Sequence, residues 1–89
     1  MATVSFTGQL QRHVDCPARS VSGGTLREVM EAYFKEQPGV RGYVFDEQDT
    51  VRRHIVIFID GVQARDRKSC SDAVGPSSEI YVMQALSGG

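Results

Sequence analysis

The sequence contains few of the residues from which metal centres and disulfide frameworks are built. Its 89 residues include two cysteines, two histidines and no tryptophan. The cysteines do not form a Cys-x-x-Cys pair, and they do not combine with His13 and His54 into a zinc-type spacing. We therefore expect no metal site and no disulfide framework, with Cys16 and Cys70 present as thiols.

An excess of positive charge and a long apolar run are also missing. Ten Lys and Arg face eleven Asp and Glu, whereas proteins that bind nucleic acid by neutralising phosphates are clearly basic. The longest apolar run, Ile55–Ile59, is far shorter than the roughly 18 residues that a membrane helix needs. The N-terminal residues show no basic stretch followed by an apolar one. We expect a soluble, cytoplasmic protein that binds neither nucleic acid nor membrane.

No internal repeat or low-complexity segment divides the chain. A chain of this length is expected to form one domain. We predict that residues 1–89 are a single domain, in which residues 84–89 form a flexible C-terminal tail.

The N-terminal residues predict a β-hairpin. Polar and apolar residues alternate over 3–7, which places Val4 and Phe6 on one face of a half-buried strand. A turn over 8–12 leads to a second extended stretch over 13–22. Pro17 interrupts that stretch because it cannot donate a ladder hydrogen bond.

A capping box predicts the start of the main helix. The Thr25 hydroxyl can accept from the Glu28 amide, and the Glu28 side chain can reach back to Thr25. Apolar residues then follow at helical spacing: Leu26, Val29, Met30, Tyr33 and Phe34. Pro38 disfavours helical geometry in the residue before it. We predict an amphipathic helix of about three turns with its apolar face on a sheet.

The second half of the chain is predicted to be mainly strands. A short strand is expected over 42–45, and a solvated turn over 46–49. The continuous β-branched run Ile55–Ile59 favours an internal strand that is covered on both faces.

Asp60-Gly61 is typical of a type I′ turn, after which residues 62–65 would return along the preceding strand. A loop over 69–78 and a last strand over 79–83 complete the order β-β-α-β-β-β. This order predicts an α+β fold with one main helix across a mixed sheet of four to five strands. The fold is a β-grasp if the last strand lies beside the first, a pairing that periodicity alone does not determine.

The motifs that accompany catalysis are missing. Gly23-Gly24 precedes the helix but has neither the Lys-Ser/Thr of a P-loop nor three spaced glycines. Asp46, Glu47 and Asp49 lack the glycine and the distal glutamate of a calcium loop. We therefore expect a protein that is not itself an enzyme and that binds no cofactor.

The predicted hairpin would bring cationic residues together. Counting outward from Asp60-Gly61 places His54 opposite Arg67 and Arg53 opposite Lys68. This register gathers a basic patch: Arg52, Arg53, Arg65, Arg67 and Lys68. Like charges directly opposite one another are mildly destabilising. The patch is therefore either a partner-binding surface or a solvated edge that is charged against aggregation.

The sequence ends in two glycines, which are expected by chance in about one sequence in 200. Gly88 and Gly89 follow Leu86 and Ser87, shortly after the last predicted strand. Because Gly89 has no Cβ, its carboxylate can enter a narrow slot of another protein. We interpret this tail as a substrate for another protein's chemistry, the alternative being a ragged terminus.

Three stretches of the chain resemble the ThiS/MoaD family of small sulfur carriers. They are SGGTLREV at 22–29, the hairpin around Asp60-Gly61, and SEIYVM at 78–83 running into Gly88-Gly89. The length is similar to that of the CysO-like and MoaD-like members. The resemblance implies a ubiquitin-like β-grasp fold.

The resemblance also implies a reaction at Gly89. A ThiF/MoeB-type adenylating enzyme would use ATP and magnesium to make an acyl-adenylate there. Persulfide sulfur would then replace AMP, giving a C-terminal thiocarboxylate that donates sulfur to an acceptor enzyme in a biosynthetic pathway. The carrier would contribute Gly89 as the reacting residue, with Gly88, Ser87 and Leu86 as its tail.

Three alternatives remain open at this point. A ubiquitin-like modifier would be conjugated through Gly89 to lysines of other proteins. A molybdopterin synthase small subunit would insert its tail into a larger partner. A noncovalent interaction domain would function without Gly88 and Gly89.

Overall fold

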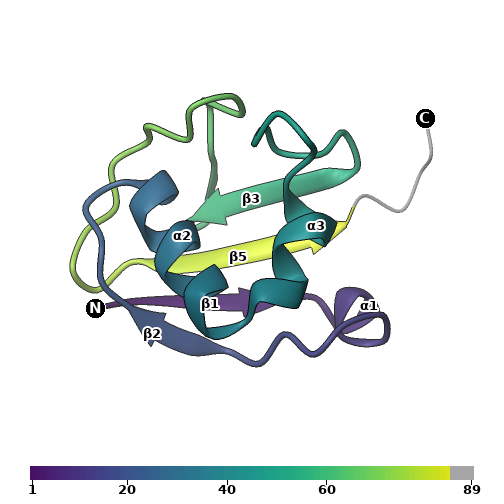
Figure 1. Ribbon diagram of the computed structural model, residues 1–89. Helices are drawn as coiled ribbons and strands as arrows, with labels where there is room; N and C mark the ends of the chain where they lie inside the picture. Colours follow the sequence, from purple (N-terminus) through teal and green to yellow (C-terminus); the bar gives the residue numbers. More distant parts are fainter. Residues whose placement is uncertain (85–89) are drawn as a thin grey trace.

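The first and last strands lie side by side at the centre of the sheet (Figure 1). In the computed structural model, which describes residues 1–84, β1 (Ala2–Phe6) pairs in parallel with β5 (Glu79–Gln84). Val4 lies opposite Ile80, and Phe6 lies opposite Val82. This pairing confirms the β-grasp that the sequence left undetermined.

The complete sheet has five strands in the order β2-β1-β5-β3-β4. Strand β2 (Arg19–Val21) is antiparallel to β1, and β3 (Ile55–Ile59) is antiparallel to β5. The edge strand β4 (Val62–Gln63) pairs with the end of β3. The predicted α+β class, the mixed sheet and the hairpin between the first two strands are confirmed, although β2 is much shorter than the predicted stretch 13–22.

Helix α2 (Leu26–Glu36) covers one face of the sheet, and all five apolar residues of its predicted stripe are buried. The Thr25 hydroxyl accepts from the Glu28 amide at 3.2 Å, as predicted. The Glu28 carboxylate accepts from the Gly24 amide at 2.8 Å, one residue before the expected Thr25. The hydroxyl of Tyr33 donates to the Pro17 carbonyl at 2.7 Å and joins the helix to the segment before β2.

The predicted strand over 42–45 is wrong. The chain forms a 3-10 turn, η1 (Pro38–Val40), and then a short helix, α3 (Arg41–Val44). Val40 and Val44 stand four residues apart, which places both on one helical face, and both are buried. Packing of this face against the core outweighs the strand propensity of the local sequence.

A helical turn, α1 (Gly8–Gln11), occupies the predicted turn after β1. Leu10 is buried in the core, and the side-chain amide of Gln11 donates to the Phe6 carbonyl at 3.0 Å. These two contacts hold α1 at the end of the sheet.

The Asp60-Gly61 turn is confirmed, because both residues have the positive φ that a type I′ turn requires, 51° and 84°. Ile59 pairs with Val62 as predicted. Strand β4 nevertheless stops at Gln63, because the amides of Arg65 and Asp66 donate to the Asp72 carboxylate at 3.0 and 2.9 Å.

One face of the sheet carries no helix in the described part of the chain. Ile55 and Ile57 of β3 are buried under the helices, but Val56 and Phe58 on the opposite face are partly exposed. Tyr81 of β5 lies on that open face and is 42% exposed. The expectation that both faces of β3 are covered is therefore wrong. No helix within residues 1–84 is both long and apolar enough to cross a membrane.

Candidate functional site

Strand β5 leads the chain out of the centre of the sheet towards the predicted site. Gln84, which the sequence assigned to the tail, is the last residue of β5 and pairs with Ile55. Leu86, Ser87, Gly88 and Gly89 lie outside the described residues. Because Gly89 is five positions beyond Gln84, the two are at most about 18 Å apart.

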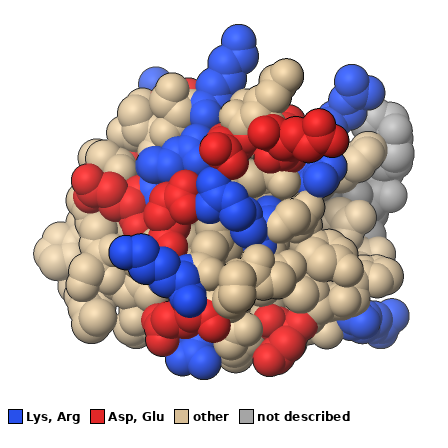
Figure 2. Space-filling view, in the orientation of Figure 1, with Lys and Arg blue, Asp and Glu red and all other residues tan. Residues whose placement is uncertain are grey.

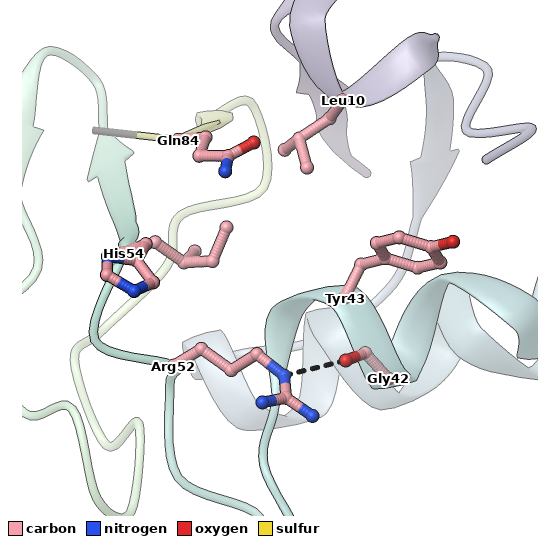
Figure 3. Close-up of a pocket in the computed structure, with 7 residues that line it drawn as sticks. Leu10, Gly42, Tyr43, Arg52, His54 and Gln84 are labelled. Carbon is pink, nitrogen blue, oxygen red and sulfur yellow. Dashed lines mark hydrogen bonds between the residues drawn. The ribbon is translucent and has the colours of Figure 1, made fainter. Parts of the chain in front are cut away.

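A groove of about 270 Å³ opens at this end of the sheet (Figure 3). Its walls come from α1, α3, the start of β3 and the end of β5: Leu10, Gly42, Tyr43, Arg52, His54, Ile55 and Gln84. Side chains alternate along β5, so Gln84 lies on the same face of the sheet as the buried Ile80 and Val82. The apolar layer between the sheet and the helices therefore ends at this polar residue, where the groove opens.

Three side chains shape the rim of the groove (Figure 3). The Arg52 Nε donates to the Gly42 carbonyl at 2.7 Å, which ties the segment before β3 to α3. The Tyr43 hydroxyl points away from the cavity and donates to the His13 carbonyl at 3.4 Å, so its ring forms a wall. His54 is exposed. The groove thus combines an apolar floor with hydrogen-bond donors at its edge.

The predicted basic patch does not form in the expected register. The Val51 amide donates to the Arg67 carbonyl at 3.0 Å, and an Arg67 Nη donates to the Arg52 carbonyl. Arg67 therefore lies beside residues 51–52 instead of opposite His54. The register fails because the Asp72 carboxylate binds the amides of Arg65 and Asp66 and turns the chain away from β3 after Ala64, whose amide still donates to the Ile57 carbonyl.

The remaining cations of the predicted patch do not belong to the groove. Arg53, Arg65 and Lys68 are exposed, and none of them lines the groove. Figure 2 shows acidic and basic side chains intermixed on the face that carries the helices. Of the five predicted partner-binding residues, Arg52 is the one at the groove.

Ion pairs hold α3, and with it the Tyr43 wall, against α2. The Arg41 guanidinium forms ion pairs with Glu31 of α2 and with Asp49. Its hydrogen bonds hold the pKa of Glu31 below its usual value, and those to Asp49 do the same for that carboxyl. Arg27 donates to the carbonyls of Asp49 and Lys68 at 2.7 and 2.9 Å. These contacts join α2 to the loop after α3 and to the loop after β4.

The two cysteines are poorly placed to act as nucleophiles. Cys16 and Cys70 are both buried, and burial raises the pKa of each thiol, which disfavours the nucleophilic thiolate. Within residues 1–84, no group of three His, Cys, Asp or Glu side chains could hold a metal ion.

The sequence did not point to the groove. Leu10, Tyr43, His54 and Gln84 come from four separate segments, and the expected strand over 42–45 gave Tyr43 no role. The one signal in the sequence was Gln84, a polar residue at a strand position whose side chain should face the core, as those of Ile80 and Val82 do. Only the closure of the fold brings these residues together.

Several solved structures match this fold over nearly their whole length. A chain of the Amycolatopsis orientalis BexX/CysO complex matches with a TM-score of 0.83 and 19% identity, covering 100% of both chains. CysO of Mycobacterium tuberculosis matches at 0.81 and 20% identity, covering 97% of this chain and 100% of that chain. The small archaeal modifier protein 1 of Methanosarcina acetivorans matches at 0.80 and 21% identity, covering 99% and 95%. No family model and no curated protein matches the sequence. At these identities the likeness establishes the ubiquitin-like fold.

Proposed function

We propose that the chain is a sulfur carrier whose Gly89 carboxylate is adenylated and then converted to a thiocarboxylate. One observation carries the proposal: β5, the central strand of a β-grasp sheet, continues in sequence to Gly88-Gly89. The similarity in fold to CysO proteins over nearly the whole of both chains supports it. The protein would be the substrate of a ThiF/MoeB-type enzyme, which uses ATP and magnesium.

The chemistry explains why a carrier needs the activation. A free carboxylate is a poor acyl donor, so its oxygen first attacks the α-phosphorus of ATP, and pyrophosphate leaves. The terminal sulfur of a persulfide then attacks the carbonyl carbon and AMP leaves. The product is an acyl disulfide, in which the new bond joins the Gly89 carbonyl carbon to sulfur. A second thiol attacks the donor's own sulfur and breaks the sulfur–sulfur bond that came from the persulfide, which leaves the thiocarboxylate on Gly89 and a disulfide between the donor and that thiol. The stored sulfur is then available to an acceptor enzyme.

The test is to coexpress the chain with a ThiF/MoeB-type enzyme of its own organism and a sulfur source, and to fragment the product in a mass spectrometer. We expect oxygen to be replaced by sulfur at Gly89. Localisation matters, because oxidation of Met1, Met30 or Met83 adds nearly the same mass. A chain that lacks Gly88 and Gly89 is the control and should give no modified terminus. An unmodified Gly89, with an enzyme that is active on another carrier, contradicts the proposal.

A ubiquitin-like modifier is the second candidate, and one comparison favours it. The matching Methanosarcina acetivorans protein is named a modifier. A modifier shares the adenylation step but ends in an isopeptide bond between Gly89 and a lysine. Gel-shifted conjugates that disappear when Gly89 is deleted would identify this function. A stable complex with a molybdopterin synthase large subunit would identify the third candidate, and full function without Gly88-Gly89 would identify an interaction domain.

A further inference from the structure

We propose that the groove at the end of β5 is a docking pocket for the adenylating enzyme, and that it accepts an apolar side chain flanked by a carboxylate. The inference rests on the proposed function. It assigns a partner-binding role to Tyr43 and Arg52, residues that lie more than thirty positions before the reacting glycine.

The position of the groove brings it close to any enzyme that acts on Gly89. Gln84 lines the groove, and Gly89 is at most about 18 Å further along the chain. An enzyme that encloses the glycine must therefore place its own surface close to the end of β5. The groove is the recess of the described structure that adjoins this point (Figure 3).

The size and lining of the groove fit a protein side chain. Its volume of about 270 Å³ lies below the roughly 300–1,000 Å³ of pockets that enclose free small molecules. Leu10 and Ile55 lie at the floor of the groove and are already buried, at 3% and 2% exposed, so the apolar surface left for a partner to cover is mainly the Tyr43 ring. Tyr43 is 43% exposed, and a partner docked in the groove would bury its ring. An aliphatic or aromatic side chain would cover this surface.

The donors at the rim specify a carboxylate beside that apolar side chain. Arg52 uses its Nε for the Gly42 carbonyl, and its Nη groups make no hydrogen bond to the described residues. A guanidinium with free Nη donors pairs well with a carboxylate. His54 adds a ring nitrogen, and Gln84 adds an amide beside Leu10, at the end of the groove opposite Arg52 (Figure 3). No carboxylate lines the groove itself in the described structure.

The experiment measures ATP–pyrophosphate exchange by the same ThiF/MoeB-type enzyme as a function of carrier concentration. Tyr43→Ala and Arg52→Gln should each raise the KM for the carrier about fivefold or more, with kcat changed less. Tyr43→Phe keeps the ring and should restore the KM of the unmodified chain. Arg19→Gln removes the same charge on β2, where Arg19 forms an exposed ion pair with Glu36, and should leave the KM unchanged.

The open face of the sheet supplies a matched comparison. Tyr81 is as exposed as Tyr43, at 42% against 43%. If Tyr81→Ala raises the KM while Tyr43→Ala and Arg52→Gln leave it within twofold, the enzyme docks on the open face and the inference is overturned. An equal effect of Arg19→Gln and Arg52→Gln would also overturn it, because the charge would then act at long range. Absence of exchange with the unmodified chain would reject the proposed function as well. Circular dichroism melting of each variant identifies a loss of folding.

Discussion

Ser78 connects the start of β5 to the β3–β4 turn through the carboxylate of Asp60. The Ser78 hydroxyl donates to Asp60 Oδ2 at 2.8 Å and accepts from the Gly75 amide at the same distance. The other carboxylate oxygen accepts from the Glu79 amide at 2.9 Å. The hydrogen bond from the Glu79 amide has the largest effect on Asp60, and together with the bond from the Ser78 hydroxyl it holds the pKa of Asp60 below its usual value. The central strand is thus tied at its beginning to the turn that follows its neighbour.

Ser78→Ala should lower the free energy of unfolding by about 1–2 kcal/mol, because it leaves a backbone donor and a carboxylate oxygen without their buried partner. Urea unfolding at neutral pH measures this change. The neighbouring Ser77 is exposed, and Ser77→Ala is the matched control, with a change near zero. Equal effects of the two substitutions would show that the Asp60–Ser78 contact contributes nothing to stability.

The two glycines before α2 should differ sharply in their tolerance of alanine. A Cβ at Gly23 would lie 2.8 Å from both the amide nitrogen and Cγ2 of Val29, so the helix start would have to move. We expect Gly23→Ala to cost about 1–3 kcal/mol of unfolding free energy. A Cβ at Gly24 meets only the Glu28 carboxylate at 3.6 Å. A thermal melt should therefore show Gly24→Ala close to the unmodified chain, and a reversed order would contradict the packing described.

Arg27 should not be replaceable by lysine. Its guanidinium donates to the carbonyls of Asp49, Lys68 and Ser69 from one planar group and lies 4.7 Å from the centre of the Phe45 ring. A lysine ammonium cannot reproduce this fork. Arg27→Lys should lower the free energy of unfolding by about 1–2 kcal/mol, measured by chemical denaturation. Arg19→Lys changes only an exposed ion pair and should have little effect.

The loop after β4 should lose stability in acid through Asp66. Hydrogen bonds from the Ser71 hydroxyl, then from the Ser69 and Ser71 amides, lower the pKa of Asp66 from 3.8 to about 2. A carboxyl whose folded pKa is depressed stabilises the fold above its unfolded pKa. That contribution is therefore complete above about pH 5 and disappears as the pH falls from 3.8 towards 2.

Denaturant midpoints between pH 6 and pH 2 measure this effect. Asp66→Asn should be less stable at pH 6, and its midpoint should fall less steeply below pH 4. The carboxylates of Glu31, Asp49, Asp60 and Asp72 also have lowered pKa values and should leave a residual slope. Parallel curves for Asp66→Asn and the unmodified chain would show that Asp66 is not the group responsible.

A side chain at the last position should impair the reaction without affecting the domain. Gly89→Val places a branched Cβ beside the carboxylate that must enter the enzyme. We expect ATP–pyrophosphate exchange to fall at least tenfold at saturating carrier, while Gly39→Ala, at an exposed position with open space around its Cα, leaves exchange unchanged. Unchanged turnover of Gly89→Val would argue against adenylation at this residue.

Local chemistry determined the parts of the fold that the sequence predicted correctly. The helix start depends on a hydroxyl and an amide three residues apart, and the type I′ turn depends on two adjacent residues that tolerate positive φ. The apolar stripe of α2 follows from helical periodicity alone. The candidate tail remains a prediction, which rests on the absence of a Cβ at Gly88 and Gly89, a property of the residues themselves.

Contacts between distant segments decided the rest. Residues 42–45 have strand propensity, but a helical turn buries both Val40 and Val44 in the core, and this packing decides the local structure. The predicted register of the basic patch is wrong because the Asp72 carboxylate accepts hydrogen bonds from the backbone amides of Arg65 and Asp66, which would otherwise have continued β4. The groove exists because β1 and β5 pair in parallel, which brings α1 beside the end of β5. A pattern within a few residues carries no information on contacts between distant segments, because these contacts contribute free energy only in the folded chain.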